Sequence, residues 1–214
     1  MAQPMLYVRP MQRRGFTLVE LMIVVAIVGI LAALGIYGVR KYQQSAATGE
    51  ATAVLQSIRG AEEAFRAETL TYGGCRSTSA APTLAATALT AADFYPRIAD
   101  STNLNNRKMQ WGGAAYANLL SCTRALGIQS SGAVRFTYGV TAGNPGVAAP
   151  AAPTGAPALP ALLTWTASEP WFTAVALADR DSDGSFARVV VYSTSNEVGI
   201  QNDTESVSYT HLTL

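Results

Sequence analysis

An uninterrupted apolar stretch near the N-terminus limits most strongly what this chain can form. The residues from Leu21 to Val39 include no charged or strongly polar side chain. Their number is close to the roughly 20 residues that an α-helix needs to cross a hydrocarbon core. Arg9, Arg13 and Arg14 precede the stretch, and positive residues of this kind hold their side of a span in the cytoplasm. The sequence therefore predicts a membrane-spanning helix whose C-terminal continuation lies outside the inner membrane.

One carboxylate, Glu20, stands at the start of this stretch. A carboxylate next to hydrocarbon costs several kcal/mol unless it is protonated or paired. A secretory signal peptide has a shorter apolar region of about 7–15 residues, and a plain membrane anchor explains the arginines and the length but not Glu20. Cleavage between Gly15 and Phe16 would create an α-amino group shortly before Glu20. A neighbouring subunit could then bring that amine against the carboxylate.

The segment "RRGFTLVELMIVVAIVGILAA" resembles the leader and N-terminal helix of a type IV prepilin. A short basic leader ends in Gly15, Phe16 follows as the new first residue, and Glu20 precedes the apolar run. The resemblance is close over about the first quarter of the chain. It implies the type IV pilin fold, of the α+β class, in which a long N-terminal helix packs on a C-terminal antiparallel β-sheet.

The same resemblance assigns the processing and assembly residues. It implies cleavage after Gly15 and N-methylation of Phe16 by a prepilin peptidase/methyltransferase, and contact between Glu20 and the Phe16 amine of a neighbouring subunit. Residues 1–15 would be the leader peptide, and residues 16–40 the transmembrane and assembly half of the helix. The precursor would lie in the inner membrane, and the pilus assembly machinery would pack it into an extracellular, homo-oligomeric helical filament.

Helical patterning continues beyond the membrane segment, and a helix from Thr17 to Glu68 would be about 78 Å long. Apolar residues recur at steps of three and four on one face of its second half. They are Ala51, Val54, Leu55, Ile58, Ala61 and Phe65. An amphipathic half-helix needs a globular layer on one side, so residues 41–205 are predicted to form a globular domain in the periplasm or outside the cell. Residues 206–214 break the pattern and are interpreted as a non-native tail.

Three strand signals, the first of which alternates Val134, Phe136 and Tyr138 with small or polar residues, predict an antiparallel sheet packed on this half-helix. The strands are expected at 133–142, at either 161–167 or 171–179, and at 186–194. The proline- and alanine-rich residues 143–160 are expected to form an extended surface loop. A short helix or turn is expected before Pro96, and residues 111–126 fit either a helix or an irregular loop.

The chain has two cysteines, Cys75 and Cys122. Neither lies in a CxxC pair and no histidine cluster accompanies them, which argues against zinc. If this part of the chain is exported, the two are expected to form a disulfide, while two separate buried thiols remain the alternative.

An acidic segment, "DRDSDGS", begins at Asp179. Alternating Asp179, Asp181 and Asp183 resemble the start of a calcium loop, but Val190 stands where an EF-hand needs its bidentate glutamate. A hairpin turn built on Asp183-Gly184 explains the same residues. Calcium is therefore the one cofactor left open, and none other is expected.

Charge and residue types argue against catalysis and nucleic-acid binding. The net charge is +1, so no overall field favours a specific nucleic acid. The single histidine, His211, lies in the tail, which leaves no Ser-His-Asp or Cys-His arrangement. The favoured function is a structural type IV pilus subunit, serving motility, adhesion or DNA uptake. The alternatives are a pseudopilin of a type II secretion system and a membrane-tethered calcium-binding module.

Overall fold

The computed structural model describes residues 15–84, 86, 89–96, 108–112, 116–148, 168–179 and 186–201. Its elements are helix α1 (Leu18–Thr69), the 3-10 helix η1 (Ala91–Asp93), helix α2 (Ala117–Ala125) and strands β1 (Thr137–Gly143), β2 (Trp171–Ala178), β3 (Ala187–Tyr192) and β4 (Ser195–Gln201). The chain divides into two units, Met1–Gln43 and Gln44–Leu214.

In the first unit, α1 is apolar on every side from Leu21 to Val39. All its large apolar side chains from Leu18 to Val39 are at least 52% exposed within the chain. By length and composition, α1 is able to cross a membrane. A helix that is hydrophobic all round needs lipid or other protein around it. The predicted helix, Thr17 to Glu68, is confirmed with one residue of difference at each end.

In the second unit, α1 buries one narrow stripe of side chains. The stripe consists of Ala47, Ala51, Leu55, Ile58 and Glu62. Val54, Ala61 and Phe65, which the sequence placed in the core, lie beside this stripe and are only partly buried. Both sets satisfy helical spacing, so periodicity alone did not decide which line of residues meets the sheet. Burial of Glu62 was not predicted, because an acidic residue is almost never fully buried unless it is paired.

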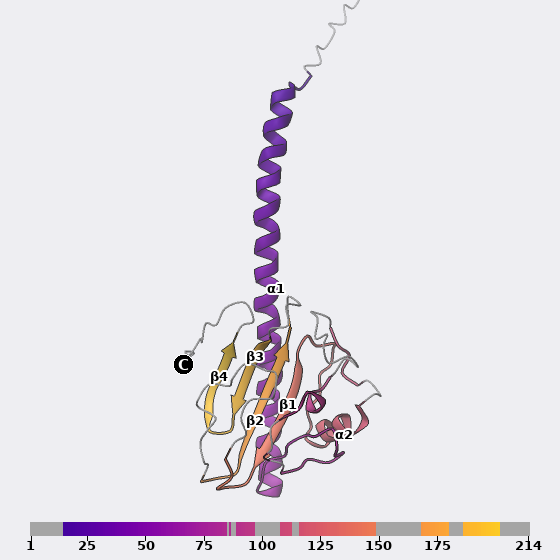
Figure 1. Ribbon diagram of the computed structural model, residues 1–214, viewed down its shortest axis with the longest axis vertical. Helices are drawn as coiled ribbons and strands as arrows, with labels where there is room; N and C mark the ends of the chain where they lie inside the picture. The colour runs from indigo at the N-terminus through magenta and orange to yellow at the C-terminus, as the bar shows by residue number, and fades with distance from the viewer. Residues whose placement is uncertain are drawn as a thin grey trace, which may run out of the picture. The chain divides into compact units, whose positions relative to one another are not determined.

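The sheet has four antiparallel strands in the order β1-β2-β3-β4 (Figure 1). Of the two candidates for the middle strand, Trp171–Ala178 forms β2, and residues 161–167 lie outside the described residues. Strand β4 was not predicted. It follows β3 after a two-residue connection, Ser193-Thr194, and its sequence contains Gly199 and few β-branched residues, which weakens the strand signal.

The two faces of the sheet carry different side chains. The inner face packs against α1 in the main core and uses small residues, including Ala174, Ala176 and Ala187. Small side chains let a helix approach a sheet closely, and the alternation along β2 and β3 puts them all on one face. A second cluster on the outer face contains Val175, Val190 and other apolar residues, with Leu89 and Phe94 packed over it. Both faces are covered, so these strands read as nearly continuous apolar runs.

The segment after α1 returns along the sheet and is anchored by a buried ion pair. Arg76 lies 3.3 Å from Asp93, with each side chain 7% exposed. Asp93 accepts further hydrogen bonds from the backbone N–H groups of Ser77 and Thr90. Burial alone would raise the pKa of Asp93, but these hydrogen bonds outweigh it and the net shift is downward.

The two ambiguous regions of the sequence are settled in this part of the fold. The turn expected before Pro96 contains η1, and residues 111–126 contain α2 rather than being irregular throughout. Of the proline-rich residues 143–160, only those up to 148 are described. The tail, 206–214, lies outside the described residues.

Candidate assembly segment

The N-terminus of α1 is closed by a reciprocal pair of side chains. The Thr17 hydroxyl accepts a hydrogen bond from the Glu20 backbone N–H at 3.2 Å. The Glu20 carboxylate in turn accepts from the Thr17 backbone N–H and hydroxyl, each at 3.4 Å. This is a capping box, which satisfies N–H groups that a helix start would otherwise leave without partners.

The capping box gives Glu20 a local role in the helix, which was not predicted from the sequence. The signal was present, because Thr17-Leu18-Val19-Glu20 has the threonine-x-x-glutamate spacing of such a box. A carboxylate in the first helical turn is also favoured by the helix dipole. Capping therefore reduces the free-energy cost of Glu20 in a single chain, before any neighbouring subunit is present.

The residues expected at the cleavage site are next to this box. Phe16 is 82% exposed, and a side chain added at Gly15 would meet no atom of the chain within 4 Å. Nothing inside the fold therefore requires glycine at position 15. The rest of the expected leader, residues 1–14, lies outside the described residues.

Comparison with known proteins identifies the segment. The prokaryotic N-terminal methylation motif matches residues 10–36. The type IV major pilin protein PilA of Myxococcus xanthus (strain DK1622) is 47% identical over 57 residues. The N-terminal segment of the chain therefore carries the methylation motif and is similar to that of a type IV pilin.

The likeness of this pilin-like chain to its relative is confined to one segment. It covers 27% of the chain and 26% of the M. xanthus protein. No solved structure matches the chain. The α+β fold that the resemblance implied is nevertheless present, as a long N-terminal helix followed by an antiparallel sheet.

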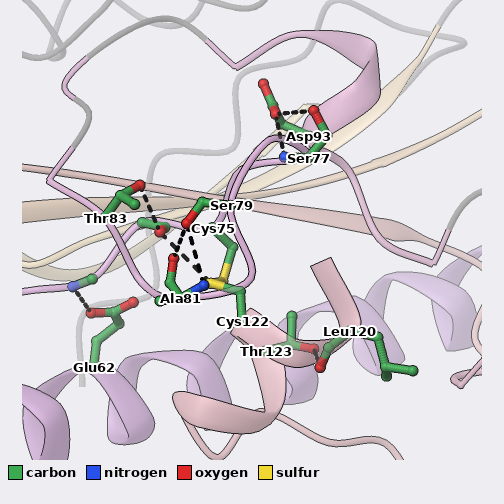
Figure 2. The surroundings of a disulfide bond; sticks show 12 residues. Glu62, Cys75, Ser77, Ser79, Ala81, Thr83, Asp93, Leu120, Cys122 and Thr123 are labelled. Carbon is green, nitrogen blue, oxygen red and sulfur yellow. Dashed lines mark hydrogen bonds between the residues drawn. A yellow bond between two sulfur atoms is a disulfide. The ribbon is translucent and has the colours of Figure 1, made fainter. Parts of the chain in front are cut away.

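The pilin-like chain has the expected disulfide in its second unit. Cys75 and Cys122 are bonded, with their Cα atoms 5.7 Å apart. Figure 2 shows how the bond joins the segment after α1 to α2. The Cys75 backbone N–H also donates to the carbonyl of Val140 in β1 at 3.1 Å. The alternative of two separate thiols is thus excluded.

Glu62 of α1 lies near this bond and is fully buried (Figure 2). Its Oε2 accepts a hydrogen bond from the Gly73 backbone N–H at 2.9 Å, while Oε1 has no partner. Burial raises the pKa of Glu62 to about 8; the Gly73 hydrogen bond opposes this rise and the charge of Glu63 adds to it. The side chain is therefore protonated in the folded protein at neutral pH.

We expect Glu62→Gln to remove a pH dependence from folding. The carboxyl ionises near pH 4.5 when unfolded and near pH 8 when folded. Its stabilising contribution is full below the lower value and is lost as the pH rises towards the upper one, with a slope of about 1.4 kcal/mol per pH unit. The free energy of unfolding from urea titrations between pH 5 and 8 should fall in the wild type and stay flatter in Glu62→Gln. Glu68→Gln, at an exposed position of the same helix, is the matched control, and equal slopes in all three proteins would refute the assignment.

The candidate calcium ligands are only partly within the described residues. Asp179 follows β2 and is 3% exposed, whereas Asp181 and Asp183 lie outside the described residues. In the part of the chain that the structure describes, no group of three or more His, Cys, Asp or Glu side chains could hold a metal ion.

Proposed function

We propose that the chain is a structural subunit of a type IV pilus, cleaved and N-methylated before its helices pack into a filament. The observation that carries the proposal is the first part of α1, a capped helix that has apolar residues on all sides and directly follows Phe16. The methylation motif supports the processing, because its match spans the proposed cleavage site.

The physical route to a filament follows from the same helix. In the membrane, lipid surrounds the apolar side chains of the precursor; in a filament, the helices of neighbouring subunits would surround them. Exchange of one apolar environment for another involves little desolvation, so packing and specific polar contacts decide the association. The disulfide and the two-sided core of the second unit suit a domain that is exposed outside the cell.

We expect the mature protein to begin at Phe16 with a methylated amine. A glycine before the cut suits a narrow peptidase site, and nothing in the fold itself requires one there. Gly15→Leu should therefore block cleavage and leave uncut precursor in the membrane, while the folded domain is unchanged. Intact-mass measurement of membrane-extracted protein checks both results.

A matched control separates peptidase recognition from a general loss of helix flexibility. Gly29 lies inside the apolar helix, and a side chain added there would also meet no atom within 4 Å. Gly29→Ala should therefore be cleaved as the wild type is. A mature chain that begins at Met1, or that begins after Ala33, would contradict the proposed processing.

A further inference from the structure

A group of buried polar side chains on the outer face of the sheet is not used by the functions considered above. In the part of the chain that the structure describes, this face has buried polar atoms with no hydrogen-bond partner, which belong to Thr137, Thr173, Arg188 and Tyr192. In native proteins the large majority of such atoms are paired. A concentration of such atoms on one face is typical of a place that holds ordered water or a bound polar group.

The strand register places these residues in two rows on one face of the sheet, with the row of Val175 and Val190 between them. Arg188 of β3 and Thr137 of β1 are both cross-strand partners of Leu177, which lies between them on β2. Tyr192 of β3 is the direct partner of Thr173 of β2. Because side chains alternate between the two faces of a strand, Arg188 and Tyr192 point to the same outer face, on either side of Val190.

The guanidinium of Arg188 is the decisive group. The residue is 1% exposed, and Nε and both terminal nitrogens lack partners. Burial lowers the pKa of Arg188 only to about 10, and the nearby Tyr192 opposes the shift, so the group carries its charge at neutral pH. Burial raises the pKa of Tyr192 to about 12, so its hydroxyl keeps its proton and is available as a donor.

The free energy of this arrangement requires a negative partner. An uncompensated buried charge costs several kcal/mol, and removing one partner of a buried pair typically costs 3–5 kcal/mol. The neighbouring positions of β3, Ala187 and Val189, are apolar and belong to the inner-face core. A guanidinium presents a planar fork of N–H groups that fits the two oxygens of a carboxylate or phosphate.

We propose that Arg188 and Tyr192 form the centre of a buried oxyanion-binding site on the outer face of the sheet. The ligand is a carboxylate or phosphate group, held by the guanidinium fork and the phenol hydroxyl. Thr173, beside Tyr192, supplies a further hydroxyl. The site does not depend on filament formation and belongs to the second unit of the chain.

The test is thermal unfolding of the full chain in detergent, at constant ionic strength with chloride as the reference anion. Inorganic phosphate and acetate are each titrated to about 10 mM, with overnight equilibration because the guanidinium is buried. Binding to the native state should raise the wild-type Tm saturably, by about 5 °C at a hundredfold excess over Kd. Arg188→Met should show no anion-dependent shift, and Tyr192→Phe should raise Kd about tenfold, since it loses a hydrogen bond to a charged group.

Two controls make the result specific. Arg66→Met removes a half-buried arginine of α1 that pairs with the exposed Glu169, and this variant should respond to phosphate as the wild type does. Phosphate also stabilises proteins without binding a site, but that effect would be equal in Arg188→Met and would not saturate. A wild-type Tm that does not respond to either anion, or an equal response in Arg188→Met, overturns the proposal. If Arg188→Met fails to fold, the Kd of Tyr192→Phe for phosphate tests the proposal. A Kd equal to that of the wild type overturns the proposal.

Discussion

Filaments should be lost, with insertion and cleavage intact, when Glu20 is replaced by valine. A more apolar helix inserts into a membrane at least as well as the wild type, and the proposed cleavage site before Phe16 is unchanged. Between subunits, however, the carboxylate would meet the Phe16 amine of a neighbour in a medium of low dielectric, where the ionised pair is favoured. The pair would also select one stagger between helices that are otherwise apolar on every side.

The capping box adds a second reason for Glu20, and two variants separate the two roles. Glutamine at position 20 can still accept the Thr17 N–H hydrogen bond, because capping boxes use either residue, but it has no charge for an intersubunit pair. Thr17→Val removes the hydroxyl of the box and leaves the charge of Glu20. If pairing is essential, Glu20→Gln fails to assemble and Thr17→Val assembles; if capping is essential, the reverse holds.

The measurement is made in cells that express each variant without wild-type protein. Intact mass reports cleavage, and the amount of chain in sheared filaments reports assembly. We expect filament yield in Glu20→Val and Glu20→Gln to fall at least about tenfold, which corresponds to a loss of about 1.4 kcal/mol of association free energy. A normal yield from Glu20→Val would show that Glu20 is a tolerated carboxylate at the membrane interface.

Removal of the disulfide should lower the stability of the second unit by about 4 kcal/mol. The bond closes a loop with a sequence separation of 47, and the chain-entropy relation for a loop of this length gives that magnitude. Cys75 and Cys122 are 3% and 0% exposed, so alanine is the replacement that leaves no buried hydroxyl. A fall of about 10 °C in Tm is expected for Cys75→Ala/Cys122→Ala.

The single variants are the control for this prediction. Each one already removes the whole cross-link, so Cys75→Ala and Cys122→Ala should each be about as unstable as the double variant. Such non-additivity is the signature of coupled residues. If the two single effects instead add up to that of the double variant, the cost comes from packing of the side chains, and the cross-link contributes little.

Several features of the fold could not be read from the sequence, for reasons that are physical. A disulfide requires two Cβ atoms at bonding distance, and the distance between Cys75 and Cys122 is set by how α2 packs. Strand β4 has little intrinsic signal and forms because β3 offers it a partner. The stripe buried by α1 includes Glu62, an acidic residue whose burial was not predicted from the sequence.

The candidate assembly segment could be predicted from the sequence, whereas the polar group on the outer face of the sheet could not. The position of Glu20, the proposed cut before Phe16 and the apolar run are local features, and the sequence contains each of them in a contiguous segment. The capping box was also readable from Thr17 and Glu20. The outer-face group around Arg188 was not readable, because it joins residues of three strands through their register.

By itself, the sequence determined what depends on composition over short distances: an apolar helix after a basic segment, its amphipathic continuation, and the positions of strands β1 to β3. A run such as Leu21 to Val39 has no polar side chain to present to water, so any fold must give it an apolar environment. Only the tertiary structure decided which face of α1 meets the sheet, whether the two cysteines come within bonding distance, and which charged groups are buried. These features depend on distances between residues far apart in the chain. The residue types of Glu62 and Arg188 alone would have placed both at the surface, and their burial follows from the packing.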